Sequence, residues 1–257
     1  MCRHVVPGLR GQGPRRGAHA RRGGLNLVPV IAIDGPSGSG KGTVARRVAR
    51  RLGWHLLDSG ALYRLVALAG MRAGLALDDV EGHARLATSL DVQFGMDERG
   101  DEQVRLSGAD VTRDLRAETT GEAASRVAAW QPVRSALLGR QRAFAAAPGL
   151  VADGRDMGSI VFRDAGLKIF LTATPAERAR RRHNQLKEKG LSVSLAALSA
   201  EIAERDRRDT TRAVAPLVAV PDAIVVDSTA LSIEEVVGRV LALARERFPE
   251  AACGSET

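Results

Sequence analysis

The stretch Val30-Ile-Ala-Ile-Asp-Gly-Pro-Ser-Gly-Ser-Gly-Lys-Gly-Thr43 decides the fold, because an apolar run passes directly into a glycine-rich turn that ends in lysine. Residues 29–33 are apolar and β-branched without alternation, which predicts a strand buried on both faces. A helix is expected from about residue 42 to residue 52. Strand, glycine-rich turn and helix in this order are the context of a phosphate-binding loop.

The glycine-rich turn predicts a site for the phosphates of a nucleotide. Glycines let the backbone fold into a concavity whose N–H groups, with the helix N-terminus, face the β- and γ-phosphates. Lys41 adds positive charge, and the hydroxyl of Thr43 is a suitable ligand for Mg²⁺. Gly42 separates these two residues, unlike the common NTPase spelling, and threonine at position 43 disfavours a dinucleotide-binding fold. The predicted loop comprises Gly35, Pro36, Ser37, Gly38, Ser39, Gly40, Lys41, Gly42 and Thr43.

Strands and helices alternate along the rest of the chain. Further strands are expected at residues 55–58, 150–153, 167–171 and 223–227, and helices at residues 60–73 and after Thr174 and Ser232. This order predicts an α/β fold: a five-stranded, doubly wound parallel sheet with helices on both faces. Alternating runs at 91–94 and 103–106 predict a hairpin, and alanine-rich helical stretches follow at 114–147, so a mixed α/β insertion is expected.

Charge and composition restrict the function classes. Six of the eight excess positive charges are arginines of residues 1–28, a Gly/Arg/Pro-rich tail without acidic residues that we expect to be disordered. Aromatics form only 3% of the chain, so nucleic-acid binding is not expected beyond weak contacts of this tail. The two cysteines, Cys2 and Cys253, suit a reducing compartment, and no apolar run could span a bilayer. A cytoplasmic location is therefore expected.

The ends of the second and third strands carry candidate acceptor residues. In a doubly wound sheet the carboxyl ends of the strands face the ligand crevice. Arg64 follows the strand end Asp58-Ser-Gly60 by about one helical turn, and its forked donors suit a monophosphate. Three residues of the stretch 153–158 are candidates. We expect Asp153 to face Mg²⁺ through water, Arg155 to face a phosphate, and Asp156 to face a hydrogen-bonding base or sugar.

Two arginine clusters follow the fourth strand. Arg178, Arg181 and Arg182 share a helix face by their spacing, and Arg205, Arg208, Asp209 and Arg212 precede Pro216. Such helices are often only solvated, and Glu177, Glu188 and Glu204 could pair with some of these arginines. Phosphoryl transfer, however, needs several cations around the moving charge. Both clusters are therefore candidates for a catalytic role.

Taken together, these residues resemble the bacterial cytidylate kinases, which are nucleoside monophosphate kinases. The resemblance extends from about Pro29 to Phe248 and leaves out the arginine-rich tail. It implies transfer of a phosphoryl group from ATP to CMP or dCMP with Mg²⁺. Separately, nothing in the sequence suggests an obligate partner, so a monomer is expected. The motifs that carry the resemblance are the loop at 35–43, Asp-Ser-Gly-x-x-Tyr-Arg at 58–64, Arg-Gln-Arg-Ala-Phe at 140–144, Asp-Gly-Arg-Asp-Met-Gly at 153–158 and Arg-Ala-Val-Ala-Pro-Leu at 212–217.

The resemblance also implies a role for each site residue. ATP would lie in the loop, and the catalytic residues would be Lys41, Arg155, Arg178, Arg181 and Arg182, with Thr43 and Asp153 at the metal. The acceptor would be bound through its phosphate by Arg64, Arg155 and Arg212, through its cytosine by Ser125, Arg134 and Asp156, through its sugar by Arg205 and Asp209, and also by Ser59. The kinase domain would span residues 29–257, with a monophosphate-binding insertion at about 60–147 and a mobile lid at about 180–195.

Two other functions stay open on the residues alone. A kinase for a different small acceptor would carry the same loop and Arg64, since neither selects cytosine. A P-loop NTPase that acts as a nucleic-acid or protein switch is disfavoured by the Gly42 spacing and the arginine-rich acceptor side. The sequence leaves the choice among CMP, dCMP and UMP undecided.

Overall fold

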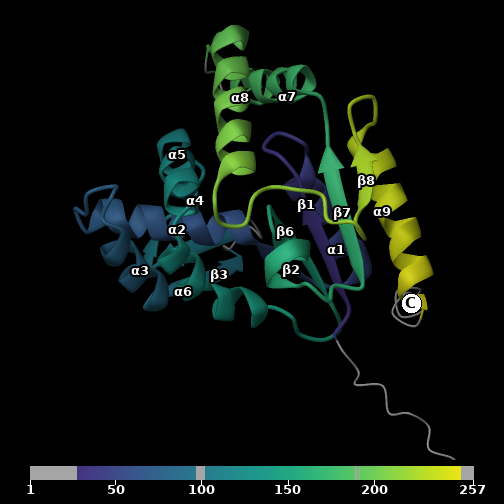
Figure 1. Cartoon of the computed structure of the whole chain (residues 1–257), viewed down its shortest axis with the longest axis horizontal. Helices are drawn as coiled ribbons and strands as arrows, with labels where there is room; N and C mark the ends of the chain where they lie inside the picture. Colours follow the sequence, from purple (N-terminus) through teal and green to yellow (C-terminus); the bar gives the residue numbers. More distant parts are fainter. Residues whose placement is uncertain (1–27, 97–101, 189, 191, 250–257) are drawn as a thin grey trace, which may run out of the picture.

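The computed structural model describes residues 28–96, 102–188, 190 and 192–249 (Figure 1). The tail that the sequence predicts to be disordered lies outside these residues except for Val28. No helix within the described residues is long and apolar enough to cross a membrane.

A five-stranded parallel sheet forms the centre of the fold, as predicted. Its order is β2-β6-β1-β7-β8, and every adjacent pair runs parallel. The central strand lies between two neighbours and is buried along its whole length, which explains its unbroken apolar run. The strands are β1 (Val30–Asp34), β2 (His55–Asp58), β6 (Leu150–Gly154), β7 (Leu167–Thr172) and β8 (Ile224–Asp227).

Helices cover both faces of this sheet, so the doubly wound arrangement is confirmed (Figure 1). Ile31 and Ile33 of β1 belong to one core, which they share with helices α1 (Lys41–Leu52) and α9 (Ile233–Arg247). The alternate residues of β1 belong to the second core, together with α2 (Ser59–Arg72) and α6 (Gln131–Arg142). The complete capping box that starts α9 at Ser232 was predicted from the sequence.

The segment between β2 and β6 is the mixed α/β insertion that the sequence predicts. Strands β3 (Val92–Met96) and β4 (Glu102–Leu106) pair antiparallel as the expected hairpin, with a short β5 (Ala109–Asp110) beside β4. Three of its helices are α4 (Thr112–Leu115), α5 (Glu118–Val127) and α6. One more helix, α3 (Val80–Thr88), was not predicted; the side chain of Asp79 caps it by accepting a hydrogen bond from the Gly82 N–H at 2.8 Å.

Two helices after β7 overhang the carboxyl end of the sheet (Figure 1). They are α7 (Pro175–Glu188) and α8 (Leu195–Thr211), and they pack against each other. The predicted start of α7 is confirmed, and the Glu177 N–H donates to Thr174 Oγ1 at 3.3 Å. The predicted lid, at about 180–195, includes the end of α7 and the first residue of α8. Its residues 189 and 191 lie outside the described residues.

Candidate functional site

A cleft at the carboxyl end of the sheet brings the phosphate loop and the acceptor candidates together. It contains a larger pocket of about 640 Å³ and a smaller pocket of about 280 Å³. Both Lys41 and Arg64 line both pockets, so the loop and the first acceptor arginine face the same space. The residues shared by the two pockets are Ser37, Lys41, Gly42, Arg64, Ser125 and Arg205.

The phosphate loop turns sharply from β1 into α1. Gly40 precedes the helix with φ of 89°, a left-handed conformation that favours glycine because it has no Cβ. The Lys41 ammonium donates to the Pro36 carbonyl at 3.2 Å, within the loop itself. Most of the predicted loop residues line the cleft, while Gly35, Pro36 and Ser39 belong to the turn behind that lining.

The carboxylate of Asp153 lies directly beneath the first turn of α1. A Cβ at position 42 would be only 3.1 Å from Asp153 Oδ2, so the glycine between lysine and threonine leaves room for this carboxylate. Burial lowers the pKa of Lys41 and raises the pKa of Asp153, and the attraction between their charges opposes both shifts. Asp153 Oδ1 is buried without a hydrogen-bond partner, an arrangement that is costly unless a ligand supplies one.

The smaller pocket contains a buried ion pair and an unpartnered hydroxyl. Arg134 of α6 pairs with Asp156, which is only 2% exposed, and donates to the Ala128 carbonyl at 3.1 Å. The Arg134 guanidinium also lies 5.8 Å from the centre of the Tyr63 ring. Ser125 Oγ, on α5, is buried and has no hydrogen-bond partner. The structure thus gathers three residues from separate elements around one small space.

The arginines around the smaller pocket are held by neighbours, yet several keep free donors. Arg64 donates to the carbonyls of Leu115 and Ala117 at 3.0 and 3.2 Å, and Arg155 donates to Asp209 at 2.8 Å. Burial is the largest single influence and opposes the ionisation of Asp209, but the charge and hydrogen bond of Arg155, together with the charges of Arg205 and Arg212, hold the pKa of this carboxyl below its usual value. Ser59 is buried in the same pocket wall.

Helix α8 and the residues after it add two further arginines. Arg205 Nε and Arg212 Nη2 are buried without hydrogen-bond partners. Burial, followed by the positive charge of Arg155, lowers the pKa of Arg205 to about 10, and burial also lowers the pKa of Arg212. So many guanidinium groups in one cleft repel each other unless an anion lies between them. The cleft is therefore suited to a ligand with more than one negative charge.

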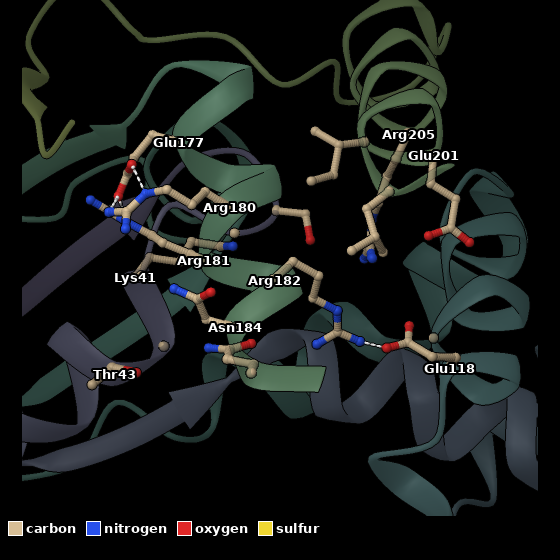
Figure 2. A pocket seen from close by; sticks show the side chains of 18 of the residues that line it. Lys41, Thr43, Glu118, Glu177, Arg180, Arg181, Arg182, Asn184, Glu201 and Arg205 are labelled. Carbon is tan, nitrogen blue, oxygen red and sulfur yellow. Dashed lines mark hydrogen bonds and ion pairs between the residues drawn. The ribbon is translucent and has the colours of Figure 1, made fainter. Parts of the chain in front are cut away.

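The three predicted arginines of α7, which are Arg178, Arg181 and Arg182, do not share one environment. Arg182 reaches across the larger pocket and pairs with Glu118 of α5 (Figure 2). Arg181 lines the same pocket and donates to Glu177 at 2.8 Å and to the Ser39 carbonyl at 3.3 Å. The structure brings these two predicted residues to the cleft.

Arg178 instead lies behind the phosphate loop and lines neither pocket. Its guanidinium is buried, forms two hydrogen bonds with Asp206 of α8, and donates to the Ser37 carbonyl at 3.1 Å. These contacts fasten the loop to α7 and α8. A direct catalytic role for Arg178 stays a prediction.

Sequence reasoning missed residues that hold the site in place. Ser228 Oγ lies 3.2 Å from the Ser39 carbonyl oxygen, and Asp34 accepts hydrogen bonds from two backbone N–H groups of the turn after Asp156. Asp34 and Ser228 stand at the carboxyl ends of two strands of the sheet, where the ligand crevice is expected, so this placement could have identified them. Asp206 carries no such local signal, because its pairing with Arg178 depends on how two helices pack.

Comparison with known proteins extends over the whole of this site. A protein-family model described as Cytidylate kinase matches residues 31–246. A protein named Cytidylate kinase from Stutzerimonas stutzeri (strain A1501) is 61% identical over 224 residues, which cover 87% of this chain and 98% of that protein. Two further proteins of that name are 59% and 54% identical, from Pseudomonas paraeruginosa (83% and 94% covered) and Aeromonas salmonicida (88% and 97% covered). The chain belongs to the cytidylate kinase family.

Proposed function

We propose that this chain transfers the γ-phosphoryl group of ATP to CMP or dCMP and forms ADP with CDP or dCDP. The observation that carries the proposal is the shared cleft, in which Lys41 and Arg64 line both pockets. The larger pocket, of about 640 Å³, has the phosphate loop in its wall and would take the nucleoside triphosphate, and the smaller one has the groups to bind a base and a phosphate. A bisubstrate reaction needs such a pair of connected pockets.

The donor nucleotide would bind along the phosphate loop. The loop N–H groups and the N-terminus of α1 would hold the β- and γ-phosphates, and Lys41 would neutralise charge between them. Arg181 and Arg182 line the same pocket and would act on the phosphates of ATP as charge moves to the β-phosphate. Arg178 would act as their support, since it holds the Ser37 carbonyl from behind.

The residues present also fit a magnesium ion. Thr43 offers a hydroxyl and Asp153 a buried carboxylate oxygen without a protein partner, and both are hard oxygen ligands. Within the described residues no group of three or more His, Cys, Asp and Glu side chains could hold a metal, which suits an ion that retains waters and binds phosphate oxygens. When bound, Mg²⁺ would neutralise charge on the β- and γ-phosphates.

The acceptor base would lie between Ser125 and the Arg134–Asp156 pair. Cytosine presents an exocyclic amine that needs an acceptor, and a ring nitrogen and carbonyl oxygen that need donors. Asp156 and the donors of Arg134 and Ser125 are complementary to that pattern. A wrong base would leave such buried groups unpaired, at a cost of roughly 1–3 kcal/mol each.

The acceptor's phosphate and sugar would be bound by the surrounding arginines. Arg64, Arg155 and Arg212 offer donors for the phosphate, and Ser59 lies in the same wall. Arg205 and Asp209 are one helical turn apart on α8 and would contact the sugar hydroxyls. Which hydroxyl each contacts decides the preference between CMP and dCMP.

The chemistry needs positioning and charge neutralisation rather than a covalent intermediate. An oxygen of the acceptor phosphate forms a bond to the γ-phosphorus while the bond from that phosphorus to the bridging β-phosphate oxygen breaks, and ADP leaves. None of the histidines within the described residues lines either pocket, so no imidazole is placed to act as a base there. The guanidinium and ammonium groups supply the electrostatic stabilisation.

A panel of acceptors tests the proposal. The purified protein is given ATP and Mg²⁺ with CMP, dCMP, UMP, AMP or GMP in turn, and ADP release is measured. We expect stimulation by CMP or dCMP and none by AMP or GMP. Turnover that is independent of any monophosphate, or that is stimulated only by DNA or RNA, would support an NTPase switch instead.

The domain organisation belongs to the same proposal. We infer one kinase domain from residue 29 to residue 257, in which the insertion at about 60–147 binds the monophosphate and the segment at about 180–195 closes over ATP. The insertion contributes Arg64, Ser125 and Arg134 to the smaller pocket, which supports the first assignment. Action as a monomer in the cytoplasm completes the proposal, and size-exclusion chromatography with light scattering tests the monomer.

A further inference from the structure

Asp34 is a buried carboxylate that lies beside the site without entering it. It is the last residue of β1, directly before the phosphate loop, and it is 7% exposed. It lines neither pocket, so it has no access to a nucleotide in either of them. Its two oxygens accept hydrogen bonds from the N–H groups of Met157 and Gly158, both at 2.8 Å.

These two N–H groups belong to the turn that carries the acceptor residues. Asp156 stands at the N-terminal cap of the short π-helix η1 (Met157–Val161). The first N–H groups of any helix lack an intrahelical partner, and an aspartate at the cap commonly accepts from them. The side chain of Asp156 makes no such capping bond, because it pairs with Arg134. Asp34 therefore provides the cap from another strand and leaves Asp156 available to the smaller pocket.

The surroundings of Asp34 do not favour a charge unless those two hydrogen bonds are made. The pKa of Asp34 is raised to about 6: burial is the largest cause, the two N–H donors act against it, and the negative charge of Asp156 adds to it. Asp153 adds negative charge and Arg155 positive charge nearby, and both the aliphatic stem of Lys168 and Asp34 Oδ2 would lie within 3.4 Å of a Cβ at Gly158. A side chain whose main described contacts are two N–H groups of one turn is suited to fixing that turn.

We propose that Asp34 is a positioning residue for the acceptor nucleotide, which fixes the turn at 154–158 so that Arg155 and Asp156 keep their place in the smaller pocket. This inference rests on the proposed function. The inference separates two roles of the end of β1. The backbone that follows Asp34 forms the loop for the donor nucleotide, whereas the Asp34 side chain positions residues that bind the acceptor. Loss of that side chain should affect the acceptor far more than ATP.

The variant Asp34→Asn tests this assignment. The amide has nearly the same shape, but it can accept from only one of the two N–H groups and turns an NH₂ group toward the other. We expect the KM for CMP to rise by about tenfold or more, while the KM for ATP changes by less than about twofold. Asp34→Ala, which has no acceptor, should raise the KM for CMP further. Thermal unfolding of each variant is measured alongside.

Asp227→Asn is the matched control. Asp227 is also an aspartate at the end of a parallel strand, and it accepts from the Thr229 N–H at 2.8 Å, but it lines neither pocket. Its KM values should equal those of the unmodified chain. If Asp34→Asn raises both KM values equally, or lowers only the melting temperature, the positioning role is overturned while the proposed function stands. If the unmodified chain shows no CMP-dependent turnover, the proposed function fails and takes this inference with it.

Hydrogen exchange of the unmodified chain gives a test that needs no variant. The amides of Met157 and Gly158 should be protected from exchange in the CMP complex, because each donates to Asp34. Their protection should exceed that of the amides at the start of α5, whose preceding residue, Ala117, provides no side-chain cap. Rapid exchange of both amides would overturn the proposal even if Asp34→Asn does not fold.

Discussion

The two sides of the cleft are built in opposite ways. The phosphate loop is one continuous stretch, 35–43, that runs from the end of β1 into the first turn of α1, and its predicted function depends mostly on backbone N–H groups. The smaller pocket is assembled from side chains of α2, α5, α6, the end of β6, and α8. The first is therefore encoded locally, while the second exists only when distant elements pack correctly.

This difference separates the expected effects of substitution. A change in the phosphate loop should remove catalysis and leave the fold, because few side chains of the loop take part in packing. A change in the smaller pocket should affect affinity for the acceptor and also stability, because its polar side chains are paired in the interior. The following predictions test that separation.

Lys41→Ala is expected to have the largest effect, lowering kcat by at least about a thousandfold. The ammonium is the mobile charge of the loop, and the side-chain hydrogen bond described for it, to the Pro36 carbonyl, lies within the loop. The melting temperature should therefore change little. ADP release at saturating CMP, with circular dichroism of the same sample, measures both quantities.

Arg51→Ala is the control for Lys41→Ala. Arg51 is a cation on the same helix, and neither it nor Glu234, with which it forms an exposed ion pair, lines either pocket. Its turnover should be unchanged, since exposed pairs of this kind contribute about 0–1 kcal/mol. Normal turnover by Lys41→Ala would contradict the assignment of the phosphate loop.

Asp156→Ala should have the next largest effect, and of the two substrates it should weaken the binding of the acceptor only. We expect the KM for CMP to rise by about a hundredfold with little change in the KM for ATP. Unlike the loop variant, it should also destabilise the fold by about 3–5 kcal/mol, because it leaves the buried Arg134 without its partner. Steady-state kinetics and urea unfolding measure the two effects.

Asp156→Asn separates the two roles of this residue. The amide keeps an oxygen for Arg134 and should recover part of the stability, but its altered donors and acceptors should still weaken CMP. Equal losses of affinity for CMP and ATP in both variants would contradict a role in reading the base.

The contrast also explains how much the sequence could predict. The parallel sheet, the loop and the strand ends follow from contiguous patterns: β-branched runs, glycines before lysine, and aspartates that end strands. Those patterns placed Lys41, Arg64, Asp153 and Asp156 at one crevice, as the structure has them. Helix α3 was missed because it is only nine residues long and is held in the insertion by packing against α2 and α6.

Packing between helices was beyond the sequence. The spacing of Arg178, Arg181 and Arg182 predicts one helix face, yet the structure buries Arg178 and directs Arg182 into the cleft. The cause is that the first turn of α7 lies against α8 and the phosphate loop, where Asp206 and the Ser37 carbonyl meet the Arg178 guanidinium. The sequence shows that Gly42 is an unusual insertion between the lysine and the threonine of the loop. Only the structure shows the reason, because the carboxylate of Asp153 lies where a side chain at position 42 would extend.

Glu118→Gln should have a smaller effect, confined to the donor side. Glu118 of α5 pairs with Arg182 across the larger pocket and so competes with a triphosphate for that guanidinium (Figure 2). Removal of its charge should lower the KM for ATP by about two- to fivefold, the range expected for an exposed ion pair. Glu122→Gln, in the same wall but without a described bond to Arg182, is the control. A rise in the KM for ATP would show that the pair assists binding instead.

Removal of residues 1–27 should have the smallest effect, because every candidate site residue lies between Gly35 and Arg212 and the sheet begins at Val30. Both KM values and kcat should match those of the full chain. The six arginines of the tail could still attract polyanions, so the two forms are compared again with added RNA at low and moderate salt. If added RNA changes the KM values or kcat of the full chain alone, and higher salt removes this change, the tail makes a weak electrostatic contact with RNA. A change in the KM for CMP without RNA would instead mean that the tail reaches the acceptor pocket, and that this pocket is not complete within the folded domain.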